Sequence, residues 1–268
     1  MLKLLKYEWK ACARTCLPMY AAVLLLALVN RLTMKDQVQA LMYGIPTALM
    51  GLLYFAVMVA VFVVTAVILI QRFYKNLLGD EGYLMFTLPV TVSQHIWAKT
   101  IIAVAMSILS TIAALLSVGI LGGGMGIIQG AATVMQNLLQ GLVQRPNEFV
   151  VGLEIVLWLL ILTVVGTLFI YLCMALGHLA KKHRVLMSVV WYFVLSTIAQ
   201  FLFMFFIMGV GNLPLEGFWM ALQDFFLSIG PAATVHIGMI LLCIGTAIPG
   251  AVFFLATRYI LKNKLNLE

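Results

Sequence analysis

Charged residues are scarce in this chain of 268 residues. They make up 9% of it, whereas 64% of the residues are hydrophobic. Soluble proteins carry about 25% charged and about 45–50% apolar residues, and in water this composition would expose apolar patches that promote aggregation. The composition therefore excludes a soluble fold and indicates that the solvent is a lipid bilayer. At about 20 residues per membrane-crossing helix, roughly six to eight spans fit, with no room for a soluble catalytic domain.

Motifs for nucleotide and metal chemistry are also missing. The sequence contains neither a G-x-x-x-x-G-K-[ST] phosphate-binding loop nor a zinc-protease HExxH motif, and its four histidines are scattered. We therefore expect no metal site, no bound cofactor and no enzymatic activity in this chain. The four cysteines lie in or beside apolar or basic segments, a distribution that gives no indication of a disulfide framework.

Six apolar segments are long enough to cross the bilayer, where a helix satisfies its own backbone hydrogen bonds. They cover approximately residues 17–34, 47–71, 99–121, 150–177, 185–210 and 233–257. A membrane barrel is excluded because its strands would alternate polar and apolar residues. The sequence therefore predicts an all-α integral membrane protein, with six transmembrane helices in a single domain that covers residues 1–268.

The basic residues predict how the six spans are oriented. With an even number of spans both termini share a side, and 13 of the 16 Lys and Arg residues fall on that side. The other three are Arg31, Lys35 and Arg145. Because cytoplasmic loops are rich in Lys and Arg, both termini are expected in the cytoplasm. Basic charge at span ends has this orienting role, so we expect no nucleic-acid partner.

Residues 1–16 predict an amphipathic helix that is retained rather than cleaved as a signal peptide. Leu2, Leu5, Trp9, Cys12 and Cys16 form one apolar stripe, and a basic stripe runs beside it. Such a helix is expected in the cytoplasmic headgroup layer, and a generic membrane anchor is the alternative. The residues assigned to this interface are Lys3, Lys6, Trp9, Lys10 and Arg14.

Two further segments are expected on the external side. Residues 122–149 alternate apolar and uncharged polar residues after three glycines, which predicts an amphipathic helix. Residues 212–232 carry an apolar stripe that is too short to cross the membrane, which predicts a re-entrant or interfacial helix.

The span centres are almost free of charge. Glu154 and His236 approach the membrane near external ends, where a polar interfacial residue is the favoured interpretation. Ion-coupled transporters need ionisable groups at depth, so any transport would draw its energy from outside the spans. Span five carries Phe201, Phe203, Met204 and Phe205. These residues could line a pathway for a hydrophobic or amphipathic substrate, although lipid contact or packing is the favoured interpretation.

The cytoplasmic loop from Arg72 to Lys99 has the most specific pattern. Asp80 is a good helix N-cap and Pro89 ends the run, so a short helix is expected between them. The apolar surface of this helix indicates that another molecule covers it. Ser93 is expected to cap the following span, and Lys99 is expected to extend toward the headgroups.

This loop resembles that of the permease subunits of ABC transporters of the type-2 exporter class. The resemblance rests on Glu81, Gly82, the Leu88-Pro89-Val90 run and Lys99, together with the amphipathic N-terminal helix and the six spans. It implies that residues 72–99 form a coupling loop whose short helix docks on a separate ATPase subunit. The docking residues that it implies are Asp80, Glu81, Gly82, Tyr83, Leu84, Phe86, Leu88 and Pro89.

The resemblance also implies partners and a location. Two ATPase subunits would bind ATP and Mg²⁺, and the permease would form a homodimer or a heterodimer with a paralogue in a bacterial plasma membrane. The substrate would be a peptide, lipid or drug. One alternative is the scaffold subunit of a vitamin-type ABC importer, which usually shows paired coupling helices with signatures that this sequence lacks. The other is an ATPase-free membrane sensor or channel component.

Overall fold

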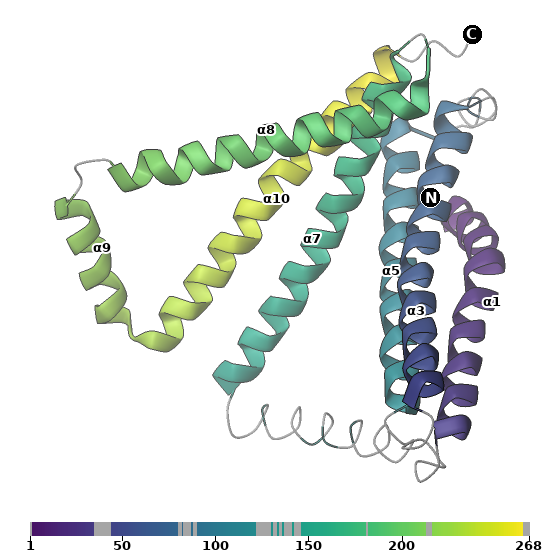
Figure 1. Ribbon diagram of the computed structural model, residues 1–268. Coiled ribbons are helices and arrows are strands. Elements are labelled where there is room, and N and C mark those ends of the chain that lie inside the picture. The colour runs from purple at the N-terminus through teal and green to yellow at the C-terminus, as the bar shows by residue number, and fades with distance from the viewer. Residues whose placement is uncertain are drawn as a thin grey trace. The chain divides into compact units, whose positions relative to one another are not determined.

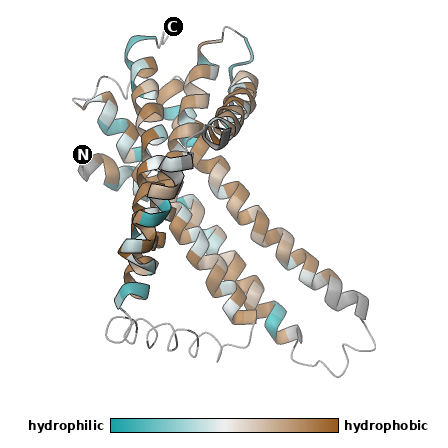
Figure 2. Ribbon diagram, turned by 90° about the vertical axis from the view of Figure 1, so that its left-hand side faces the viewer, coloured by the Kyte–Doolittle hydropathy of each residue, from teal (hydrophilic) through white to brown (hydrophobic). Residues whose placement is uncertain are grey.

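The computed structural model describes residues 2–34, 44–79, 82, 87, 90–121, 130, 133, 136, 141, 146–180, 182–212 and 216–264. Within them, six helices are long and apolar enough to cross a membrane, which confirms the predicted number. They are α1 (Leu2–Met34), α3 (Gly44–Phe73), α5 (Val92–Leu121), α7 (Pro146–His178), α8 (Arg184–Asn212) and α10 (Pro231–Asn263). Hydrophobic residues cover most of the length of these helices (Figure 2).

The helices extend beyond the predicted apolar segments. α1 has 33 residues, which at about 1.5 Å per residue is about 50 Å long, whereas the hydrocarbon core is about 30 Å thick. No helix end separates residues 1–16 from the first span, and Pro18 lies inside α1. The predicted boundary at residue 16 therefore does not coincide with a break in the helix, because the apolar stripe continues through it.

The start of α5 differs from the prediction that Ser93 is the cap. The backbone N–H of Gln94 donates to Thr91 Oγ1 at 3.4 Å, and the Gln94 side-chain oxygen accepts from the Thr91 N–H at 3.1 Å. This reciprocal pair is a capping box, and the Gln94 N–H also donates to the Thr91 carbonyl at 2.9 Å. The helix consequently begins at Val92, one residue before Ser93.

The chain divides into two compact units. The first comprises Met1–Asn76 and Leu88–Val143, and the second comprises Leu77–Thr87 and Gln144–Glu268. In the first unit α1, α3 and α5 pack side by side (Figure 1). Its apolar core includes Cys16, Tyr20, Val61, Ile102 and Met106. Each of the three helices contributes to this core, so the unit is a closed three-helix bundle.

In the second unit α7 packs against both α8 and α10. α8 meets the other two helices near the C-terminal end of α10 and diverges from them toward α9, Glu216–Ile229 (Figure 1). α7 and α10 stay in contact with each other as far as Glu154 and His236. The core at the meeting point contains Leu172, Ala175 and Ile260. Most of α8 is exposed within the chain, and none of its 18 most hydrophobic consecutive residues is buried.

Two glycines lie where helices of the second unit approach each other closely. At Gly177 of α7, a Cβ atom would overlap the backbone and side chain of Ser188 in α8. At Gly250 of α10, a Cβ atom would lie 2.7 Å from Val165 Cγ2 of α7. The lack of a side chain is therefore needed at both crossings, as is common where membrane helices approach closely.

The two predicted external segments are described to different extents. Most of 122–149 lies outside the described residues, apart from isolated positions and the first residues of α7 from Pro146 onward. The 212–232 segment contains α9 of 14 residues, which at about 1.5 Å per residue is too short to cross the hydrocarbon core. Gly230, whose φ is 89°, and Pro231 follow it and begin α10. A helix is confirmed there, and its re-entrant placement stays a prediction.

Candidate functional site

Glu8 is an acidic residue on the buried face of α1. Its exposed fraction is 6%, and Cys12 and Cys16, one and two turns further along, are also buried. Positions 5, 8, 12 and 16 recur at intervals of three and four residues and therefore share one face of a helix. Leu5, Cys12 and Cys16 pack in the core of the first unit. The periodicity that buries the apolar side chains also buries the Glu8 carboxylate.

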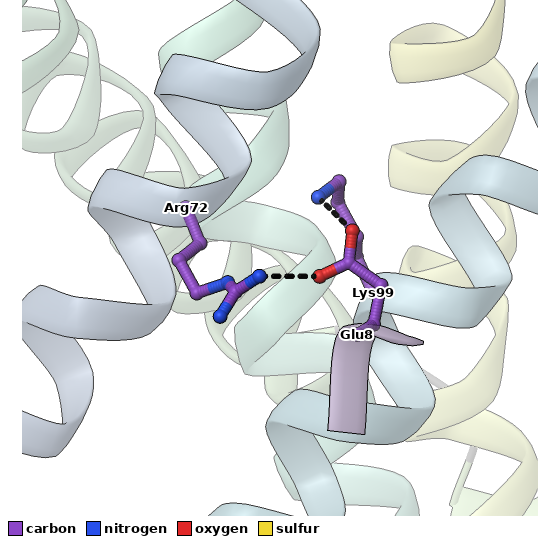
Figure 3. A network of polar contacts seen from close by, with 3 residues as sticks. All are labelled: Glu8, Arg72 and Lys99. Atoms are coloured by element: carbon purple, nitrogen blue, oxygen red, sulfur yellow. Dashed lines mark hydrogen bonds and ion pairs between the residues drawn. The ribbon is translucent and has the colours of Figure 1, made fainter. Parts of the chain in front are cut away.

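Two basic residues from different helices meet this carboxylate (Figure 3). Lys99 Nζ of α5 donates to Glu8 Oε1 at 2.8 Å, and Arg72 Nη2 of α3 donates to Glu8 Oε2 at 3.2 Å. Each carboxylate oxygen thus holds one cation, and three helices are joined at one point. We call Glu8, Arg72 and Lys99 the ion cluster.

Burial makes the ion cluster sensitive to the loss of a member. The side chains of Glu8 and Lys99 are 8% and 6% exposed, and that of Arg72 is 25% exposed. The cluster has one positive charge in excess, and the partial exposure of Arg72 lets water solvate part of it. Removing one partner of a buried ion pair typically costs about 3–5 kcal/mol because an uncompensated charge remains. Glu8 is the one member that compensates both others.

Arg72 and Lys99 are also the first and last residues of the predicted coupling loop, residues 72–99. Arg72 precedes the end of α3 by one residue, and Lys99 lies two turns into α5. The π-helix η1, Tyr74–Leu78, continues α3 into the loop, with Leu77 and Leu78 buried. Such wide turns occur often at functional sites.

The docking residues implied by the resemblance fall mostly where the chain is not described. Asp80, Glu81, Tyr83, Leu84, Phe86, Leu88 and Pro89 lie outside the described residues. Gly82 is described and buried, and its backbone N–H donates to the Gly79 carbonyl at 2.8 Å. The short helix between Asp80 and Pro89 therefore stays a prediction.

The residues assigned to the N-terminal interface lie in α1. Lys6, Lys10 and Arg14 are exposed, and Trp9 is 41% exposed. Lys3 belongs to the same helix. The basic stripe is thus available to headgroups or a partner, whereas part of the apolar stripe, Leu5, Cys12 and Cys16, packs against the bundle.

Polar side chains also join the helices of the first unit deeper in the bundle. Tyr20 Oη of α1 lies 3.2 Å from Thr65 Oγ1 of α3 and donates to the Met106 carbonyl of α5 at 3.2 Å. Tyr54 Oη lies 2.7 Å from Ser117 Oγ, which joins α3 to α5. Where lipid surrounds the helices, such hydrogen bonds fix which faces meet.

The second unit has its own polar contact near the start of α7 and α10. His236 Nδ1 lies 3.0 Å from each Glu154 carboxylate oxygen, and both side chains are partly exposed. The sequence identified these two residues separately, and the structure brings them together.

The proposed pathway residues of α8 are at the surface of the described chain. Phe201, Phe203, Met204 and Phe205 are 56%, 66%, 56% and 69% exposed. They are therefore available to lipid or to another chain. No group of three or more His, Cys, Asp or Glu side chains that could hold a metal ion occurs among the described residues.

The ion cluster is the part of the site that sequence reasoning missed. Glu8 lies among basic residues of α1, three residues after Leu5 and four before Cys12. An acid in line with an apolar stripe was the available signal. Its partners are 64 and 91 residues away in the sequence, so spacing alone did not identify them. Lys99, expected to extend toward headgroups, instead lies buried against Glu8.

A search of protein-family models, curated proteins and solved structures finds no match to this chain.

Proposed function

We propose that the chain is the membrane-spanning permease subunit of an ATP-driven ABC exporter. The observation that carries the proposal is the coupling loop, in which Glu81, Gly82 and the Leu88-Pro89-Val90 run lie between two apolar spans. Six helices able to span a membrane support it. The sequence contains no phosphate-binding loop of its own, so the energy would come from a partner.

In this proposal two ATPase subunits bind ATP and Mg²⁺ and engage the coupling loops of two permease subunits. Closure of the ATPases on ATP moves the loops, and the spans change between inward and outward access. The apolar surface of residues 80–89 supplies the docking area. The second permease subunit is either a copy of this chain or a paralogue.

The cargo in this proposal is a hydrophobic or amphipathic molecule such as a peptide, lipid or drug. Span centres with few charged residues suit apolar cargo better than ions. The exposed Phe and Met side chains of α8 are the candidate surface for it. A bacterial plasma membrane with both termini in the cytoplasm is the proposed location, consistent with the Lys and Arg distribution.

Co-expression with its cognate ATPase tests the proposal. The docking variant Leu84→Asp, Phe86→Asp places two charges on the apolar surface of the coupling loop. We expect it to lose co-purification of the ATPase and stimulation of its ATP hydrolysis, because a buried unpaired charge prevents docking. The matched control is Gln144→Asp, Asn147→Asp, which adds the same charge on the expected external side.

The outcomes separate this function from its alternatives. Undiminished co-purification and stimulation in the docking variant would remove the proposal. Failure of the wild-type chain to retain any ATPase would instead favour an ATPase-free sensor or channel component. Uptake of a cargo by vesicles with the ATPase outside, the exporter's expected direction, supports export; release from such vesicles would favour the importer scaffold.

A further inference from the structure

The two ends of the coupling loop converge on a single side chain. Arg72 comes from the last turn of α3 and Lys99 from α5, and both contact the carboxylate of Glu8 in α1 (Figure 3). The two residues that flank residues 73–98 are therefore both held by the same side chain of α1.

We propose that Glu8 is a positioning residue, which fixes both ends of the coupling loop against α1 so that movement of the loop reaches α1, α3 and α5 together. The transmission part of this inference rests on the proposed function. The fixing of the loop ends does not, because it follows from the contacts of the ion cluster alone.

The geometry of the carboxylate favours simultaneous control of both ends. Its two oxygens hold different helices, at 2.8 Å for Lys99 and 3.2 Å for Arg72. A shift of either loop end that lengthens its hydrogen bond to Glu8 beyond the usual range must move α1 or separate a buried ion pair. An aspartate at position 8 would be one methylene shorter and could not reach both cations equally.

The contacts deeper in the bundle make α1 suitable for transmitting such a movement. Tyr20 lies 12 residues after Glu8, which is about 18 Å along the helix, and its hydroxyl group contacts Thr65 of α3 and Met106 of α5. α1 is therefore bound to the same two helices at two separate levels. A displacement at the ion cluster would rotate or shift the bundle as a unit.

The inference is tested first on the isolated full-length permease in detergent, by hydrogen exchange followed by mass spectrometry. For Glu8→Gln we expect about tenfold faster exchange in peptides that cover residues 72–79 and 90–99, because loss of the ion cluster allows local opening. Peptides from α10 should exchange as in wild type. Asp224→Asn, which removes an exposed acid of α9, is the matched control.

A charge exchange keeps the test decisive if Glu8→Gln does not fold. Glu8→Lys with Lys99→Glu places a carboxylate at position 99 between two cations, and we expect it to restore slow exchange at both loop ends. The single variant Lys99→Glu leaves two acids facing Arg72 and should not. Equal exchange in the single and exchanged variants would overturn the inference, as would unchanged exchange in Glu8→Gln.

The second measurement uses the complex with the ATPase. Glu8→Gln should retain co-purification, because the docking surface is intact, yet its ATP hydrolysis should fall to the rate of the ATPase alone. Retained stimulation together with faster exchange at the loop ends would overturn the transmission role. If the wild-type chain binds no ATPase, the proposed function and the transmission role fail, and the exchange result still decides whether Glu8 fixes the loop ends.

Discussion

The two units hold their helices together by different means. In the first, buried polar groups on every helix meet one another, at the ion cluster and at the Tyr20 and Tyr54 hydroxyl groups. In the second, α7 meets α8 and α10 through glycine crossings and an apolar core. Of the 18 most hydrophobic consecutive residues in each helix, 33% are buried in α1 and 39% in α5, against 0% in α8 and 6% in α10. The third helices of the two units, α3 and α7, are alike at 17%.

This difference has a physical meaning in a bilayer. Lipid tails are as apolar as the side chains that contact them, so burying apolar surface between helices gives little driving force. Helices there associate through close packing and polar contacts. The first unit uses polar contacts and forms a closed bundle, whereas the second leaves broad apolar faces exposed within the chain.

The largest expected effect is at the ion cluster. Glu8→Ala should lower the free energy of unfolding by about 3–5 kcal/mol, because Arg72 and Lys99 lose their common counter-charge. Unfolding of the purified protein by SDS in mixed micelles measures it. Asp224→Ala removes an exposed acid from the second unit and should leave stability unchanged. A Glu8→Ala variant as stable as wild type would mean that the polar contacts do not hold the first unit together.

The six spans could be predicted from sequence because a helix in lipid needs a continuous apolar run, which is a local property. The ion cluster could not. Glu8 lies among basic residues, and its contacts depend on which faces of α1, α3 and α5 meet, which no local pattern specifies. The pairing of Glu154 with His236 was missed for the same reason, because the two residues are 82 positions apart.

The start of α5 is a smaller failure of a different kind, because its signal is local. Thr91 and Ser93 are both good caps by residue type. The choice of Thr91 depends on Gln94 lying three residues after it, where its side chain can return to the Thr91 N–H. Both residues of the capping box are visible in the sequence, whereas the prediction of Ser93 rested on its hydroxyl group alone.

The next effect in size concerns the glycine crossing of the second unit. Gly177→Ala should destabilise by about 1–3 kcal/mol, because the added methyl group would overlap Ser188 and force α7 and α8 apart. Gly166→Ala in the same helix has open space around the new methyl group and should be neutral or slightly stabilising, since alanine favours helix. Chemical unfolding of both variants compares them. Equal stabilities would show that the α7–α8 crossing tolerates separation.

Tyr20→Phe tests a polar contact of the first unit without removing a charge. The hydroxyl group contacts Thr65 and the Met106 carbonyl, and its loss should cost about 1 kcal/mol. Tyr54→Phe, which removes the contact to Ser117, should behave similarly. The same unfolding measurement applies. If both variants are neutral, the ion cluster and apolar packing suffice to hold the bundle.

The smallest expected effect is at Glu154 and His236, the polar pair of the second unit. Both side chains are about a fifth to a quarter exposed, so water and salt weaken their attraction, and a double-mutant cycle with Glu154→Gln and His236→Asn should give about 0–1 kcal/mol of coupling energy. A coupling energy as large as the loss of stability in Glu8→Ala would show that the difference in burial does not make the ion cluster the stronger contact. The second unit would then depend on a polar contact as the first does, and the contrast between the two units would be lost.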